Sequence, residues 1–146
     1  FGSLKGLSLA YIGDGNNILH SLMLLGPKAG VTIRYACPRG YEPNAFILKD
    51  AKRLAKETGA SLVACSSPEE AAKGANALYT DVWTSMGFEE EEGQREEAFE
   101  GYQVNKELYS KCAKDAIILH CLPMIRGKEI TDEMADHAKS AIFRQA

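Results

Sequence analysis

Short apolar runs alternate with longer amphipathic segments along this chain, and this alternation constrains the fold more than any other feature. The expected strands are residues 7–12, 31–36, 61–65, 76–80 and 116–120, with a last strand at 141–143. Strands that alternate with helices are joined by right-handed crossovers, which build a parallel sheet covered on both faces. The sequence therefore predicts an α/β fold: a doubly wound, Rossmann-like parallel sheet in a three-layer αβα sandwich, with residues 1–146 as one domain.

The predicted helices begin at residues that are typical of helix starts. Asn16 or Asn17 can cap a helix that runs to Leu25, because an asparagine side chain accepts hydrogen bonds from the first backbone N–H groups. Asn44 opens a helix that ends at Gly59, with Phe46, Ile47, Ala51, Leu54 and Ala55 expected on its apolar face. Shorter helices are expected at 67–74, 105–112 and 131–137.

Charge and cysteine usage narrow the classes of partner. The net charge of −3 and the lack of a basic patch argue against nucleic acid and anionic membranes. No apolar run is long enough to span a bilayer, and the first residues lack the features of a signal peptide. Four scattered cysteines without a CxxC pair favour reduced thiols over disulfides or zinc. We expect a cytoplasmic protein that binds small molecules and needs no metal.

In a doubly wound sheet, ligands bind beyond the carboxyl ends of the strands, where the strand order reverses. One candidate there is "GDGNN", residues 13–17, whose backbone N–H groups could face an anion at a helix start. A dinucleotide is not favoured, because Ile18 stands where the fingerprint needs its third glycine and the second strand lacks a following acidic residue. We therefore expect no cofactor. A tight turn with a helix cap explains both glycines but not Asp14 and a second asparagine.

Two further candidates follow later strands. In "TDVWTSMG", residues 80–87, Asp81 either caps a loop or holds a cation, and the segment ending at Gly87 could supply a hydroxyl and backbone N–H groups. The acidic run after it, 89–100, is expected to be a solvated face. In "AIILHCLP", residues 116–123, His120 and Cys121 end an apolar strand; taken alone, each is more often structural than reactive.

Together and in this order, "GDGNN", "DVWTSMG" and "HCLP" resemble the second domain of the aspartate/ornithine carbamoyltransferase family, and specifically its ornithine-binding form. The phrases "GYEPNA" at 40–45 and "GYQVN" at 101–105 are similar to the same family. The resemblance implies a transferase that moves the carbamoyl group of carbamoyl phosphate to the side-chain amine of L-ornithine, which gives L-citrulline and phosphate.

On matching positions, the resemblance implies that Asn17 lies near the ornithine carboxylate and Asp81 holds the α-ammonium group. Ser85 and the backbone of Met86 would complete this contact. Ornithine is favoured over aspartate, because an aspartate-specific relative should gather cations around two carboxylates, and this chain offers Asp81 and the "SMG" loop. Putrescine and acetylornithine stay open as alternatives.

The resemblance also implies that Cys121, His120 and Asp81 are catalytic, with His120, Cys121 and Leu122 on the carbamoyl-phosphate side. An alkylammonium has a pKa of about 10.4 and must lose a proton before it can attack. Asp81 and Cys121 could accept or orient that proton. Because the amine attacks an activated acyl phosphate directly, Cys121 need not be a covalent nucleophile.

The carbamoyl-phosphate-binding domain of the family, with its Ser-Thr-Arg-Thr motif, and its C-terminal arginine-bearing helix have no counterpart in these residues. We therefore expect an ornithine-binding domain that is inactive alone, and that works with a carbamoyl-phosphate-binding domain in a homotrimer or larger assembly. The alternatives are a non-catalytic module that binds an amino acid or a partner, and a nucleotide-binding oxidoreductase domain.

Overall fold

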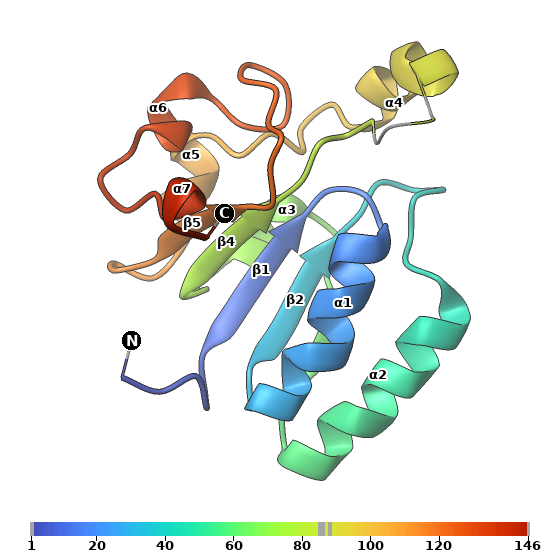
Figure 1. Cartoon of the computed structure of the whole chain (residues 1–146), viewed down its shortest axis with the longest axis vertical. Helices are drawn as coiled ribbons and strands as arrows, with labels where there is room; N and C mark the ends of the chain where they lie inside the picture. The colour runs from blue at the N-terminus through green and yellow to red at the C-terminus, as the bar shows by residue number, and fades with distance from the viewer. Residues whose placement is uncertain (1, 85–86, 88, 146) are drawn as a thin grey trace.

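The chain folds around one five-stranded parallel sheet with the strand order β3-β2-β1-β4-β5. The computed structural model describes residues 2–84, 87 and 89–145 (Figure 1). The strands are β1 (Ser8–Ile12), β2 (Thr32–Ala36), β3 (Leu62–Ala64), β4 (Ala77–Thr80) and β5 (Ile117–His120). The predicted parallel sheet is thus confirmed, and all five strands lie where the apolar runs placed them.

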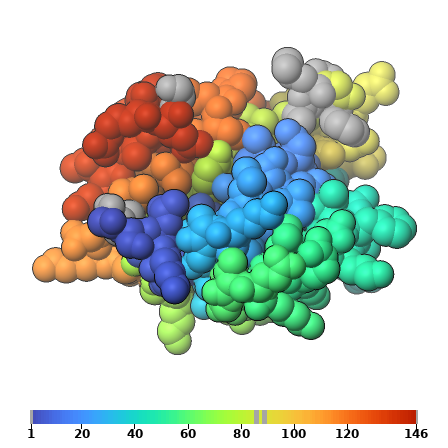
Figure 2. All heavy atoms as spheres, turned by 60° about the horizontal axis from the view of Figure 1, so that its bottom comes forward, coloured from blue at the N-terminus to red at the C-terminus, as the bar shows by residue number. Residues whose placement is uncertain are grey.

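Helices cover both faces of this sheet. They are α1 (Asn17–Leu25), α2 (Ala45–Thr58), α3 (Pro68–Ala72), α4 (Glu92–Ala98), α5 (Lys106–Tyr109), α6 (Asp132–Ala135) and α7 (Ile142–Gln145), with 3-10 turns η1 (Pro27–Ala29) and η2 (Glu89–Glu91). Figure 1 shows α1 and α2 on the near face and α3 behind the sheet, and Figure 2 shows α1 and α2 packed side by side. None of the helices in the described part of the chain is long and apolar enough to cross a membrane.

The core is divided by the sheet into two clusters, because alternate strand residues point to opposite faces. Tyr11, Ile33 and Tyr79 pack against α1 and α2 on one face. Ala10, Ile12, Leu78 and Ile118 pack on the other face against residues of α3, α5, α6 and α7. The chain therefore forms the predicted three-layer αβα sandwich.

The helix boundaries follow the capping chemistry. The side-chain oxygen of Asn16 accepts from the N–H groups of Ile18 and Leu19 at 3.0 and 3.4 Å, so Asn16 rather than Asn17 caps α1. Asn44 caps α2 in the same way. Gly59 ends α2 with φ of 76°, a left-handed conformation that glycine adopts without strain.

Two expectations about elements were wrong. Residues 141–143 form no strand. Ile142 and Phe143 are the first residues of α7, and Ile142 is buried in the core. One isolated bridge pairs Ser140 with Ile118 just before this helix. Phe46 is 80% exposed instead of facing the sheet. It lies five residues before the buried Ala51, which places it about 140° away around the helix.

The strand order reverses between β1 and β4, because the chain leaves β1 toward β2 on one side and returns to β4 on the other. At such a switch point the connections diverge, and the carboxyl ends of the two strands border an opening for a ligand. The turns after β1, β4 and β5 all end at this edge of the sheet (Figure 1).

Candidate active site

Asp81 is the centre of the site at the switch point. It directly follows β4 and is only 6% exposed. One carboxylate oxygen, Oδ2, accepts from the amide of Asn16 at 2.8 Å. The other, Oδ1, accepts from the backbone N–H of Val82 at 2.8 Å and from the thiol of Cys121 at 2.9 Å. A single carboxylate therefore joins the turns after β1, β4 and β5.

The amide that reaches Asp81 belongs to Asn16, whereas the sequence resemblance pointed to its neighbour Asn17. Asn16 both caps α1 through its oxygen and donates to Asp81 through its nitrogen. Asn17 is the first residue of α1 and its side chain is exposed. The ornithine contact expected of Asn17 stays a prediction. The cap signal in the sequence included Asn16 but did not distinguish it from Asn17.

Gly15 explains how Asn16 comes so close to the sheet edge. A Cβ atom at Gly15 would lie 2.4 Å from backbone atoms of Glu42 and Pro43. The backbone N–H of Gly15 also donates to the carbonyl of Tyr41 at 2.8 Å. The second glycine of "GDGNN" therefore allows the turn to pack against residues 41–43, and no nucleotide is needed to account for it.

Cys121 is held as a protonated thiol. Its Sγ donates to Asp81, and its pKa is raised to about 12, chiefly by burial and then by the hydrogen bond and charge of Asp81. A thiolate is the nucleophilic form of cysteine, so a thiol with this pKa is a poor nucleophile at neutral pH. The geometry suits a group that orients a neighbour.

His120 is buried completely, and both of its ring nitrogens are engaged. Its Nδ1 accepts from the backbone N–H of Leu122 at 2.9 Å, and its Nε2 lies 3.0 Å from Oε1 of Glu129. Both side chains are 0% exposed. The sequence reasoning did not include Glu129, because nothing in the sequence distinguishes it from the many surface glutamates.

Asp81, His120 and Cys121 form the one group among the described residues that could bring metal ligands together, with their ligand atoms within 4.8 Å of one another. In the observed arrangement these atoms already bond to one another or to neighbours: the thiol donates to Asp81, and both nitrogens of His120 have partners. Hydrogen bonding accounts for the cluster.

An ion pair links the helix α4 to the first turn of the site. Nη1 of Arg95 lies 2.7 Å from Oδ2 of Asp14 and also donates to the carbonyl of Trp83 at 2.9 Å, while the guanidinium lies over the ring of Tyr41. Burial raises the pKa of Asp14, and the hydrogen bond from Arg95 opposes this shift. The glutamates of the acidic run from Glu90 to Glu100 are exposed as expected, but its one arginine is buried and was missed.

Two predicted contacts, Ser85 and Met86, lie outside the described residues. Gly87, which follows them, has φ of 93°, in the region that favours glycine.

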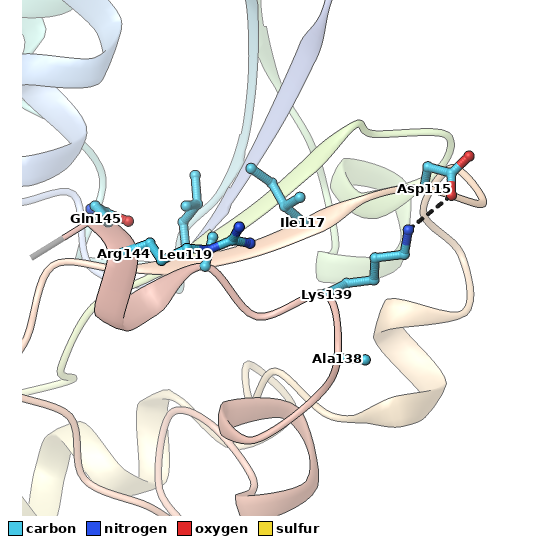
Figure 3. A pocket seen from close by; sticks show the side chains of 8 residues that line it. Asp115, Ile117, Leu119, Ala138, Lys139, Arg144 and Gln145 are labelled. Carbon is cyan, nitrogen blue, oxygen red and sulfur yellow. Dashed lines mark hydrogen bonds and ion pairs between the residues drawn. The ribbon is translucent and has the colours of Figure 1, made fainter.

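A pocket of about 740 Å³ lies along the outer strand β5 and not at the strand ends (Figure 3). Ile117 and Leu119 line it, and an ion pair between Lys139 and Asp115 lies at one end. It lacks the convergent hydrogen bonds that surround Asp81. We therefore place the candidate site at the turns of the carboxyl edge and not in this pocket.

A doubly wound sheet with a buried carboxylate, a thiol and an asparagine at its switch point defines the class: an α/β domain that binds a small polar ligand. Residues 5–146 match the family described as "Aspartate/ornithine carbamoyltransferase, Asp/Orn binding domain". The chain belongs to this family, and the resemblance seen in its three motifs is confirmed.

Individual relatives agree with this assignment. The chain is 53% identical over 146 residues to an ornithine carbamoyltransferase of Prochlorococcus marinus, and covers 46% of that protein. It is 51% identical over 144 residues to one from Halalkalibacterium halodurans, of which it covers 45%. The chain thus spans about half the length of the curated relatives it matches.

Solved structures of the same family have the same fold. The ornithine carbamoyltransferase from Pyrococcus furiosus superposes with a TM-score of 0.93 at 43% identity, over 99% of this chain and 46% of that one. The enzyme from Gloeobacter violaceus gives a TM-score of 0.89 at 46% identity, over 98% of this chain and 47% of that one.

Proposed function

We propose that this chain is the ornithine-binding half of a carbamoyltransferase, which transfers the carbamoyl group of carbamoyl phosphate to the side-chain amine of L-ornithine and releases L-citrulline and phosphate. The single observation that carries the proposal is the carboxylate of Asp81, held between Asn16 and Cys121 at the switch point. The names of the relatives support the same reaction.

Asp81 can bind the α-ammonium group of ornithine. Among the described residues, its Oδ2 accepts one hydrogen bond, from Asn16. A carboxylate oxygen has two lone-pair sites, so Oδ2 can accept an ammonium N–H as well. Hydrogen bonds between ionised groups are about twice as strong as neutral ones, which suits a contact that selects a free amino acid. Asn17, Ser85 and Met86 are the further expected contacts with the head of the substrate.

Cys121 orients the reacting amine. Since its S–H points to Asp81, the sulfur can accept an N–H of the neutral side-chain amine through a lone pair that the Tyr79 hydroxyl does not use. The amine lone pair then attacks the carbamoyl carbon. A C–N bond forms, the bond from that carbon to the phosphate oxygen breaks, and phosphate leaves with the electron pair. The proton that the amine loses passes to the departing phosphate, or through the thiol of Cys121 to the carboxylate of Asp81.

Leu122 and His120 belong to the carbamoyl side in this proposal, where the Leu122 carbonyl would accept from the carbamoyl NH₂. In this proposal the chain works with a carbamoyl-phosphate-binding domain and assembles as a homotrimer, as the family resemblance implies. The reaction needs no cofactor and no metal, because carbamoyl phosphate is already an activated acyl donor.

Citrulline formation by the full-length protein tests this function. Ornithine, putrescine and N-acetylornithine are compared at equal concentration in the presence of carbamoyl phosphate. We expect citrulline from ornithine and little product from the other two, because putrescine lacks the α-carboxylate and acetylation removes the α-ammonium charge. Absence of citrulline from ornithine would refute the proposal, and a faster reaction with putrescine would reassign the substrate.

A further inference from the structure

The turn after β5 is built on an unusual backbone. Leu122 has φ of 60°, and among the described residues it is the only one other than glycine with a positive φ. Residues with a side chain rarely adopt this conformation, and they keep it only where the surroundings hold them there. Leu122 also carries the carbonyl assigned to the carbamoyl side. The contacts that fix this turn therefore affect the position of a carbonyl that is proposed to bind substrate.

Two buried side chains hold the turn at both ends. The N–H of Leu122 donates to Nδ1 of His120 at 2.9 Å, and the N–H of Ile125 donates to Oε1 of Glu129 at 2.6 Å. The same Oε1 lies 3.0 Å from Nε2 of His120. One continuous hydrogen-bonded chain therefore runs from Leu122 through His120 and Glu129 to Ile125.

The directions of these bonds determine where the proton of His120 lies. Nδ1 accepts from a backbone N–H, so it carries no hydrogen, and Nε2 donates to Glu129. Both nitrogens are thereby occupied, and the ring is 0% exposed. A histidine in this state has no nitrogen available for a substrate, which separates His120 from a general acid or base.

We propose that Glu129 is a positioning residue: it fixes the Nε2-protonated form of His120, and the pair holds residues 121–125 so that the Cys121 thiol and the Leu122 carbonyl face the ligands. This inference rests on the proposed function for its catalytic consequence. Carboxylates that hold a histidine in one tautomer have the same role in other enzymes.

Glu129 offers a conservative variant for the test. Its second oxygen, Oε2, is buried and has no hydrogen-bond partner among the residues that the structure describes. Glu129→Gln keeps an oxygen that can accept from both His120 and Ile125, and only its NH₂ is left unpaired. Glu129→Ala removes the acceptor. Ile33→Ala, a core truncation in β2 at a residue that is 1% exposed, controls for lost stability.

Steady-state kinetics of the full-length protein give the first readout. In Glu129→Ala we expect kcat to fall by about 10²-fold, the usual effect of misplacing a reacting group by about 1 Å. The KM for ornithine should stay near the wild-type value, because Asp81 and Asn16 lie in other turns. Glu129→Gln should recover most of kcat, and Ile33→Ala should lower stability with kcat unchanged. Equal kcat in Glu129→Ala and Ile33→Ala would overturn the proposal.

Two variants of His120 separate positioning from proton transfer. The amide oxygen of His120→Asn lies near the place of Nδ1 and can accept from Leu122, whereas that of His120→Gln lies near Nε2. A positioning role predicts a higher kcat for the asparagine variant. Equal and complete loss in both variants, with native folding, would show that the imidazole itself is required and would overturn the proposal.

Nitrogen-15 spectra of the imidazole in this chain, recorded at pH 7, test the tautomer independently of catalysis. We expect the Nε2-protonated form in the wild type and a mixture of tautomers in Glu129→Ala. A protonated Nδ1 in the wild type would overturn the positioning role even if citrulline forms. Absence of citrulline together with the expected tautomer would instead remove the proposed function and leave the structural pairing intact.

Discussion

At the scale of single residues, Asp81 holds three turns together with one carboxylate. Its two oxygens accept from Asn16, Val82 and Cys121, so any change of its charge reaches each of them. The consequences differ for ligand and protein: the ligand loses a counter-ion, and Cys121 loses the charge that helps to keep its proton.

Asp81→Asn should weaken ornithine binding by about 10- to 100-fold, the value of one hydrogen bond to a charged group. The binding of carbamoyl phosphate should change much less, because the group proposed to contact Asp81 is the α-ammonium of ornithine. Calorimetric titration of the full-length protein with each substrate measures both affinities. Asp115→Asn, which removes an exposed partner of Lys139, is the matched control and should change neither. Equal losses for both substrates would contradict the role given to Asp81.

Cys121 should react slowly with iodoacetamide. With a pKa of about 12 it forms far less thiolate at pH 8 than an ordinary cysteine. After allowing for the greater reactivity of each thiolate, we expect alkylation about 10- to 100-fold slower than for an unfolded chain. Asp81→Asn should speed the reaction, because it lowers the pKa. Mass spectrometry of the peptide that contains Cys121, sampled over time, measures the rate of alkylation. Rapid alkylation in the wild type would show that the thiol is not held as described.

At the scale of elements, the sequence and the structure agree wherever one local rule decides. The strand–helix alternation predicted all five strands, and asparagine caps predicted the starts of α1 and α2. The strand predicted at 141–143 was wrong, because a short apolar run does not show whether it will pair with the edge of a sheet or pack into the core as part of a helix. The prediction that Phe46 faces the sheet was wrong, because helical periodicity does not specify which part of a wide stripe of apolar residues packs against the sheet.

The candidate site was predictable to a similar extent. Position at or just after a strand end predicted where Asp81, His120 and Cys121 lie. The contacts of Glu129 and Arg95 depend on loops that fold back from distant positions, and no spacing rule records them. Those two residues could be recognised only from the three-dimensional structure.

The turn after β1 depends on Gly15. Gly15→Ala should lower the free energy of unfolding by about 1–3 kcal/mol, because a methyl group would press on the backbone of residues 42 and 43. Gly93→Ala, in α4 with open space around it, should be neutral or stabilising by up to about 1 kcal/mol. Urea denaturation of this chain compares the two. An unchanged midpoint in Gly15→Ala would mean that the turn has room to move away.

The helix α4 is attached to the site by a buried cation. Arg95→Met should destabilise the fold by about 3 kcal/mol at pH 7, because it leaves Asp14 ionised and 13% exposed without its partner. At pH 4 the loss should be smaller, since burial raises the pKa of Asp14 and a protonated carboxyl needs no cation. Arg53→Met breaks an exposed pair with Glu57 and should cost less than about 1 kcal/mol. A loss that does not depend on pH would exclude this ion pair as the cause.

At the scale of the whole molecule, burial of the thiols links stability to alkaline pH. Burial raises the pKa of Cys37 and Cys121 to about 12 and that of Cys112 to about 11. A group whose folded pKa lies above its unfolded value contributes full stability below the unfolded pKa, about 9, and loses it as pH rises toward the folded pKa. The fold should therefore weaken between about pH 9 and pH 12.

Urea midpoints measured at pH 7 and pH 10.5 test this dependence. We expect a lower midpoint at pH 10.5 for the wild-type chain. Cys37→Ser removes one ionising group, so the difference between the two midpoints should shrink. An unchanged difference would mean that Cys37 does not contribute to the alkaline weakening.

The contacts of Asp81 also have a consequence for how the chain reaches its native state. Asp81 meets Asn16 across 65 positions and Cys121 across 40. Contacts between such distant segments close large loops, and they form late because chain entropy opposes them until the sheet has assembled. The burial of the Cys121 thiol should therefore be among the final events of refolding. The time at which Cys121 becomes protected from alkylation during refolding would therefore report when all three turns have come together.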